Sequence, residues 1–328
     1  MADNTIRNGT ADMHFTGEVK AYYGQENGGA VATWYEFYGL SMEVNDRQET
    51  EDVQPAGHRV ATGVSYGKAS ADITLQGKAT VGELAAFLGT GVAKTAPAPV
   101  TFSMFYGSAQ GGFIYSGCTV TGWNIEQDEN GINLTVNLTG GKGVWGDAPK
   151  NSGNAPGYID DGDVIMRGRE YVKNDNYGTK ILCGKTGDTE AEQGDWYSWG
   201  LEVSNLTQNV YWGDAIVPSA SGSGVMDGAF SLNWDANRNN IEEQSMTQDP
   251  QEWHIINKTA FGGKAYTVQI IFKCQCIENQ GYTDEQEIVR SFQSSHKVIE
   301  GSFGFSSHIP VTSGGTDIIA IDVNEETI

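Results

Sequence analysis

The segment GKASADITLQGKATVGELAAFLG, residues 67–89, combines a strand pattern with a helix pattern that follows it directly. In its first part apolar and polar side chains alternate, as in a strand with one buried face. The apolar set is Ala69, Ala71, Ile73 and Leu75, and the polar set is Lys68, Ser70, Asp72, Thr74 and Gln76. In its second part Thr80 and Glu83 form a capping box before a short apolar stripe, and Gly89 is placed as a C-cap. Because so short a helix is stable only when it packs on a sheet, the segment predicts a strand with a flanking helix.

A hairpin is predicted further along the chain. Residues 116–125 and 132–139 flank the dipeptide Asn130-Gly131, which favours a tight type I′ turn. Residues 132–139 alternate strictly between apolar and polar side chains, so this strand buries one face only. The first strand changes phase near Gly122, which predicts a β-bulge at that glycine.

Composition supports an all-β protein and disfavours some partners. The chain has 328 residues, with 43 glycines against 8 prolines, a bias that suits many strands joined by glycine turns. Its formal charge of −22 argues against a basic surface that grips nucleic acid or an anionic membrane. No apolar run is long enough for a membrane helix, and residues 1–15 do not have the pattern of a signal peptide. We therefore expect a cytoplasmic protein with reduced cysteines and no membrane partner.

The second half of the sequence resembles the first. Trp34-Tyr35 is echoed by Trp196-Tyr197, residues 67–77 by residues 224–234, and residues 101–106 by residues 268–276. Three matches in the same order indicate a duplication, against the alternative that similar strand patterns recur in any β protein. The glycine-rich segment 141–162 lacks periodicity and is interpreted as a linker. The predicted domains are residues 1–140 and, as a divergent repeat, 163–328.

Short motifs of enzymes and metal sites are present without their structural context. Gly63–Gly67 matches G-x-S-x-G but leads into a strand, and Gly141–Gly146 matches G-x-G-x-x-G but opens no helix. Cys274 and Cys276 fit the apolar face of a strand better than a zinc site. We predict no catalytic residue, no metal ligand and no cofactor, and hence no enzyme.

Aromatic side chains gather at two places, one in each half. They include Trp34, Tyr35, Trp196 and Tyr197. Exposed aromatic clusters serve as subunit contacts or as platforms that stack sugars. Because the cluster occurs once per half, we interpret these four residues as candidate subunit contacts.

The order of these features resembles the tail tube, or major tail, protein of long-tailed bacteriophages. The resemblance rests on the strand SADITLQG, the helix TVGELAAFLG and the hairpin that ends in LTVNLTGGKG. It covers residues 13–145, and residues 163–305 through the suspected repeat. It implies a β-sandwich or barrel with a short flanking helix, present twice in tandem, and a virion protein that forms stacked rings. The hollow tube so formed would carry DNA during ejection, after assembly in the host cytoplasm.

The resemblance also implies partners and a lumen. Copies of the chain would form trimeric pseudo-hexameric rings or hexameric rings, in contact with the terminator, the baseplate and a sheath where one exists. A tube that conducts DNA must not hold it, and the acidic charge is suited to that task. The polar strand faces supply the candidate lumen residues Asp72, Thr74, Asp227 and Asp235. The alternative is a β-sandwich module of the virion that binds a carbohydrate or a receptor.

Overall fold

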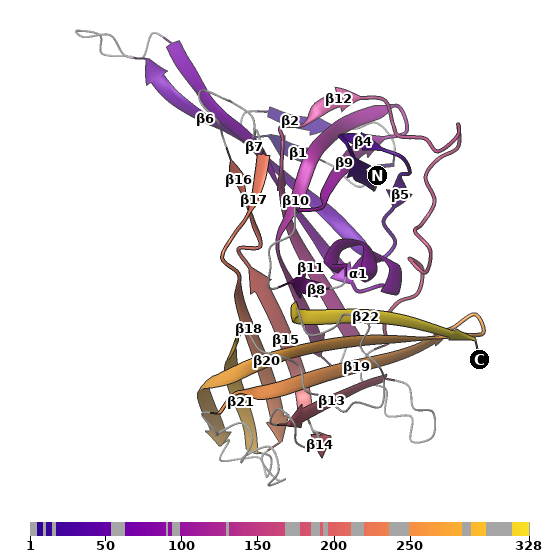
Figure 1. Ribbon diagram of the computed structural model, residues 1–328. Coiled ribbons are helices and arrows are strands. Elements are labelled where there is room, and N and C mark those ends of the chain that lie inside the picture. Colours follow the sequence, from indigo (N-terminus) through magenta and orange to yellow (C-terminus); the bar gives the residue numbers. More distant parts are fainter. Residues whose placement is uncertain are drawn as a thin grey trace.

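The computed structural model is an elongated antiparallel β protein with one short helix in its described part (Figure 1). It describes residues 5–8, 11–14, 18–53, 63–89, 91–93, 99–128, 131–167, 178–184, 191–192, 196–210, 220–235, 249–283, 290–299 and 317–327. The strands of the first half are β1 Thr5–Asn8, β2 Ala11–His14, β3 Lys20–Asn27, β4 Ala30–Val31, β5 Tyr35–Glu36, β6 Leu40–Val53, β7 Gly63–Lys78, β8 Gly91–Ala93, β9 Thr101–Ser108, β10 Gly111–Asp128, β11 Gly131–Gly140 and β12 Val144–Gly146. The strands of the second half are β13 Gly178–Gly184, β14 Ala191–Glu192, β15 Trp196–Ser204, β16 Thr207–Val210, β17 Ala220–Ser223, β18 Asp227–Asp235, β19 Gln251–Phe261, β20 Lys264–Thr283, β21 Arg290–Val298 and β22 Asp317–Thr327. The helix α1 spans Val81–Leu88. The predicted all-β class is confirmed.

The predicted strand and helix of residues 67–89 are confirmed in detail. In β7 the apolar set is buried, and the polar set stays partly or fully exposed. The Glu83 amide donates to Thr80 Oγ1 over 3.2 Å, and the apolar side of α1 faces the core. Gly89 caps the helix with φ of 57°, a conformation that glycine adopts without strain.

The predicted hairpin and bulge are confirmed as well. Strands β10 and β11 pair antiparallel up to Asp128 and Gly131, and their register shifts between Val120 and Gly122. The apolar row of β11 is buried, as the alternation predicted. The extra residue at the bulge is Thr121.

The first half has two layers that share the long strand β10. Its C-terminal part lies in the order β6–β7–β11–β10, and its N-terminal part pairs with β9 on one side and β12 on the other. Strand β3 continues the second layer beyond β9. The helix α1 lies beside this two-layered arrangement (Figure 1).

The pairing order of the first half recurs in the second. Strands β15–β18–β21–β20 follow the same order as β6–β7–β11–β10, while β13–β19–β20–β22 follows β3–β9–β10–β12. The bulge recurs too, because the register of β20 against β21 shifts between Cys276 and Glu278. Even the hairpin tips agree: β16 pairs with β17 from Thr207 to Val210, as β6 pairs with β7 from Thr50 to Val53.

These ladders correct part of the proposed sequence matches. Residues 67–77 do align with 224–234, because Ile73 and Phe230 occupy equivalent positions in the ladders of the two halves. The match of 101–106 with 268–276 is wrong, because β9 corresponds to β19 and β20 corresponds to β10. The match of Trp34 with Trp196 is wrong in register. Trp196 pairs with Trp234, and the equivalent pair of the first half is Leu40 with Gly77, so Trp196 corresponds to Leu40. A second flanking helix would fall in residues 236–248, which lie outside the described residues.

The two halves are joined edge to edge. Strand β10 pairs with β15, so that β6, β7, β11, β10, β15, β18, β21 and β20 form one continuous sheet. On the other layer β8, which follows α1, pairs with β22 of the second half. One hydrophobic core runs through both halves.

The segment 141–162 connects the halves and is bonded along its length to other parts of the chain. It contains β12, and Asn151 Nδ2 donates to the Trp34 carbonyl over 2.7 Å. The Glu36 amide donates to the Gly157 carbonyl over 2.8 Å, and Tyr266 Oη donates to Asp161 Oδ1 over 2.7 Å. The glycine-rich composition therefore does not produce an isolated flexible spacer here.

Candidate functional site

One face of the eight-stranded sheet is polar from end to end, and we name it the polar wall. Register and alternation place on it Glu43, Asn45 and Arg47 of β6; Lys68, Asp72, Thr74 and Lys78 of β7; Thr135 and Asn137 of β11; Asn124 and Glu126 of β10; Glu202 and Ser204 of β15; Asp227 and Ser231 of β18; Ser295 and Lys297 of β21; and Glu278 of β20. None of these side chains is buried. The opposite face of the same strands supplies core residues such as Leu75, Val136 and Leu232.

The predicted lumen residues lie on the polar wall, and three of them have described partners. Asp72 Oδ2 lies 2.8 Å from Arg47 Nε, and Asp227 Oδ1 lies 3.3 Å from Lys297 Nζ. Thr74 Oγ1 donates to Asn137 Oδ1 over 3.3 Å. Asp235 is on the same face by its pairing with Ser291, but its side chain lies outside the described residues. Arg47 and Lys297 each screen the charge of the neighbouring aspartate.

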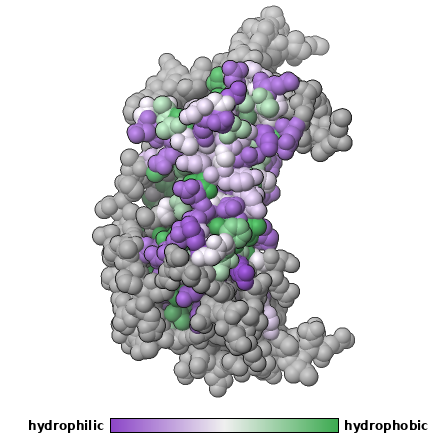
Figure 2. Space-filling view, turned by 90° about the vertical axis from the view of Figure 1, so that its right-hand side faces the viewer, coloured by the Kyte–Doolittle hydropathy of each residue, from purple (hydrophilic) through white to green (hydrophobic). Residues whose placement is uncertain are grey.

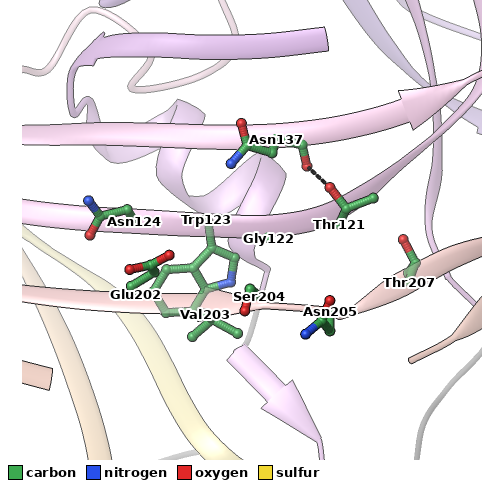
Figure 3. A pocket seen from close by; sticks show the side chains of 10 residues that line it. All are labelled: Thr121, Gly122, Trp123, Asn124, Asn137, Glu202, Val203, Ser204, Asn205 and Thr207. Carbon is green, nitrogen blue, oxygen red and sulfur yellow. Dashed lines mark hydrogen bonds between the residues drawn. The ribbon is translucent and has the colours of Figure 1, made fainter. Parts of the chain in front are cut away.

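The centre of the polar wall is the joint between the two halves. A hollow of about 210 Å³ lies there, lined by Thr121, Gly122, Trp123, Asn124, Asn137, Glu202, Val203, Ser204, Asn205 and Thr207 (Figure 3). Its walls come from β10, β11, β15 and the start of β16, and Glu202 of β15 is one of its lining residues. Glu126 accepts a hydrogen bond from Asn124 Nδ2. Glu126 and Glu202 are both exposed and form no ion pair with a described residue.

The chemistry of the polar wall is that of a charged surface. Among the described residues no group of histidine, cysteine or acidic side chains has the arrangement of a metal site. Amide, hydroxyl and carboxylate groups face solvent along every strand, and the carboxylates outnumber the basic groups. The wall residues named above carry six carboxylates and four basic groups, so their net charge is weakly negative.

The enzyme-like motifs lie in regular strands or extended segments. Gly63–Gly67 is part of β7, which pairs with β6, and Gly141–Gly146 contains β12 without a helix after it. Cys118, Cys183 and Cys274 are buried, and burial raises their pKa values above the ordinary range. Cys276 is partly exposed. In the described part of the chain, no helix is long and apolar enough to cross a membrane.

The four predicted aromatic contact residues have different environments. The prediction for Trp196 is wrong, because it is only 4% exposed and belongs to the core of its own chain. Tyr35 is half-buried with its ring centroid 5.7 Å from that of Tyr23. Trp34 and Tyr197 are also partly buried, and Trp34 is held through its backbone by Asn151. Surface roles for Trp34, Tyr35 and Tyr197 stay predictions.

Sequence reasoning did not select Trp145 and Tyr158, two aromatic residues that are at least half exposed. Trp145 of β12 is 59% exposed and meets Phe113 edge to face, with ring centroids 5.4 Å apart. Tyr38 and Tyr158 form another edge-to-face pair at 5.1 Å. Figure 2 shows the side of the molecule turned toward α1 and β12, where the described surface is a mixture of hydrophilic residues and small hydrophobic areas. Trp145 on a short edge strand and Tyr158 in a glycine-rich loop are isolated in the sequence, so neither residue gives a periodic signal.

A buried histidine lies in the core of the second half. His296 is 1% exposed and lies against Phe230 and Trp253, with ring centroids 5.6 and 5.4 Å away. Its Nε2 and Ser294 Oγ are 2.8 Å apart. Burial among these rings lowers the pKa of His296 from 6.5 to about 4, so the ring is neutral in the fold.

We predict that His296→Leu flattens the acid side of the stability profile. The unfolded chain binds a proton at His296 below pH 6.5 and the folded chain does not, so stability is lost as pH falls from 6.5 toward 4. Between pH 7 and pH 5 the wild type should lose about 2 kcal/mol more than the variant, measured by urea unfolding. Equal losses in the two proteins would show that burial does not lower the pKa of His296 in the folded chain.

In comparisons with known proteins, no family model matches this sequence, and no curated protein matches it at a significant level.

Proposed function

We propose that this chain is a structural virion protein that polymerises into stacked rings and forms the hollow tail tube of a long-tailed bacteriophage. DNA passes through the tube during ejection, and the polar wall lines the lumen. The two halves are tandem tube domains of one ring, so that three chains give a pseudo-sixfold ring. Its partners are other copies of itself and the terminator, baseplate and, where present, sheath proteins of the tail.

The observation that carries this proposal is the β10–β15 ladder, which joins two similar four-stranded sheets side by side with their polar faces continuous. Units that join edge to edge in this way use different surfaces on each side of the contact. Such heterologous contacts generate rings or filaments when they are repeated. The charge of −22 supports the same conclusion, since a conduit lined with carboxylates keeps DNA mobile.

We predict self-assembly of the purified protein. At raised concentration and in high salt, where repulsion between acidic subunits is screened, negative-stain microscopy should show rings or tubes. Low salt should shift the same sample toward small species in analytical ultracentrifugation. A protein that sediments as a monomer under all these conditions, and is absent from tubes of purified virions, contradicts the proposal.

The second candidate function is a carbohydrate- or receptor-binding module of the virion. Trp145 favours it, because an indole with 59% exposure on an edge strand is available to stack on a sugar. This function predicts discrete particles under the microscope in place of tubes. It also predicts that Trp145→Ala abolishes glycan binding, whereas a tube protein has no such binding to lose.

A further inference from the structure

The ladder between the two halves gives the geometry of one complete joint. Its five rungs are Trp123–Val203, Asn124–Glu202, Ile125–Leu201, Glu126–Gly200 and Gln127–Trp199. Trp199 Nε1 donates to Gln127 Oε1 over 2.8 Å inside the core. At the bulge the Leu206 amide donates to the Thr121 carbonyl over 2.9 Å, and Thr207 Oγ1 donates to the Val120 carbonyl over 2.8 Å.

Each side of this joint has a counterpart elsewhere in the chain. Strand β6 corresponds to β15 of the second half. Val44 of β6 pairs with Ile73 of β7, and Leu201 of β15 pairs with Phe230 at the equivalent position of β18. The C-terminal part of β20 corresponds to the C-terminal part of β10. Each follows a β-bulge, in β10 against β11 and in β20 against β21. Among the described strands, β6 pairs with β7 alone, and residues 279–283 of β20 pair with β21 alone.

The bulge itself marks the difference between the joined and the open edge. Thr121 of β10 is partly covered and bonded to the second half through its carbonyl. Its counterpart in β20 is Ile277, which is 68% exposed. Thr207, which is bonded to β10 beside Thr121, begins the β16–β17 hairpin. The equivalent residue of the β6–β7 hairpin in the first half is also a threonine, Thr50. An exposed isoleucine at an open sheet edge is a surface that another strand stabilises.

We propose that residues 42–46 of β6 pair antiparallel with residues 279–283 of β20 from a second copy of this chain. The register follows from the internal joint: Asp46 opposes Asn279, Asn45 opposes Gln280, Val44 opposes Gly281, Glu43 opposes Tyr282 and Met42 opposes Thr283. The backbone amide of Glu49 then donates to the Ile277 carbonyl of the neighbouring copy, as the Leu206 amide donates to the Thr121 carbonyl. This inference rests on the proposed function and names the surface and the partner of that assembly.

Physical chemistry is consistent with this register. No rung brings two like charges together, which is the arrangement that destabilises a cross-strand pair. The alternation of β6 keeps Glu43 and Asn45 on the polar wall, so the wall continues without interruption from one copy to the next. Strand addition to an exposed edge supplies main-chain hydrogen bonds to both partners. Because the joint is heterologous, its repetition closes a ring or extends a filament.

Cysteine cross-linking tests the register directly. In a Cys276→Ser background the remaining native cysteines are buried, which limits side reactions. The test variant is Asn45→Cys with Gln280→Cys, oxidised under conditions that favour assembly. The matched internal control is Asn124→Cys with Glu202→Cys, which occupies the same rung within one chain. The off-register control is Asn45→Cys with Glu278→Cys.

We expect the test variant to form covalent multimers on a non-reducing gel, with roughly ten-fold more product than the off-register control, because disulfides need closely opposed Cα atoms. The internal control should close within the monomer. Tubes without multimers, while the internal control closes, would overturn the inference and leave the tube function standing. Multimers without rings or tubes would support the strand pairing and overturn the tube. If neither multimers nor tubes form, both proposals are wrong.

Discussion

Tubes assembled from a Glu126→Lys, Glu202→Lys double variant are expected to bind DNA that unmodified tubes repel. Both glutamates are exposed at the centre of the polar wall, where no described basic side chain pairs with them. Each substitution reverses one charge, and every ring of the tube repeats the change. Lysines on the wall would contact phosphates and release counterions, with log K falling by about 0.9 per contact for each unit of log salt.

The measurement is DNA retention by tubes at 50 and 200 mM salt, followed by ejection rates from virions that carry the variant. At low salt we expect strong DNA retention and slow ejection. At high salt we expect retention to fall and the ejection rate to return to that of unmodified virions. The control is Asp147→Lys with Asp160→Lys, an equal charge change at exposed residues outside the polar wall. Asp160 is on the α1 side, because the neighbouring Asp161 carbonyl accepts from the Gly82 amide. Equal retention by the two variants would show that the polar wall does not face the DNA.

Local patterns in the sequence were sufficient where the chain's own neighbours determine the structure. The alternation of residues 68–76 predicted which side chains of β7 are buried, because a strand with one solvated face must alternate. The capping pair Thr80 and Glu83 located the start of α1, since its first amides need nearby acceptors. Gly122 located the bulge because the phase of apolar residues changes there.

Pairing between distant strands could not be read from these patterns. Alternation gives the two faces of β10 and β15 but not which strand lies beside which, so the joint between the halves was not predicted. The comparison of the two halves matched Trp34 with Trp196 by residue type, whereas the strand pairings show that Trp196 corresponds to Leu40. A tryptophan is as suitable for a core as for an interface, and composition alone does not separate the two.

The candidate site was predicted in outline and not in its centre. Alternation correctly assigned Asp72 and Asp227 to polar strand faces, since neither can be in the core. It could not show that Arg47 and Lys297 are close enough to pair with them. Glu126 and Glu202 were not singled out, because their neighbourhood exists only after two distant strands are joined. Long-range pairing thus decides which carboxylates are unscreened.

The start of β6, one of the two edges in the proposed ring contact, is held by a buried carboxylate. Glu83 of α1 is 1% exposed and accepts from the amides of Tyr38 and Gly39, over 2.7 and 3.2 Å, and from Thr80 Oγ1 over 2.9 Å. Burial raises the pKa of Glu83, and these hydrogen bonds oppose the rise. Gly39 is required beside it, because a Cβ there would collide with the Lys78 carbonyl oxygen. The helix therefore positions the chain at the point where β6 begins.

We expect Glu83→Ala to produce the largest loss of stability among these variants, because it leaves the partly buried amides of Tyr38 and Gly39 and the buried Thr80 hydroxyl without their acceptor. The loss should be about 3–5 kcal/mol, equivalent to a fall in Tm of roughly 10 °C in a scanning calorimeter. Glu83→Gln keeps one acceptor oxygen and should recover roughly half of the loss. Glu43→Ala on the exposed face of β6 serves as the surface control, with a change within about 0.5 kcal/mol.

If β6 supplies the ring contact, Glu83→Ala should also require a higher protein concentration for assembly than Glu83→Gln at a temperature where both are folded. A Glu83→Ala protein with unchanged Tm would mean that the amides of residues 38 and 39 find other acceptors, and that α1 does not position the edge of β6.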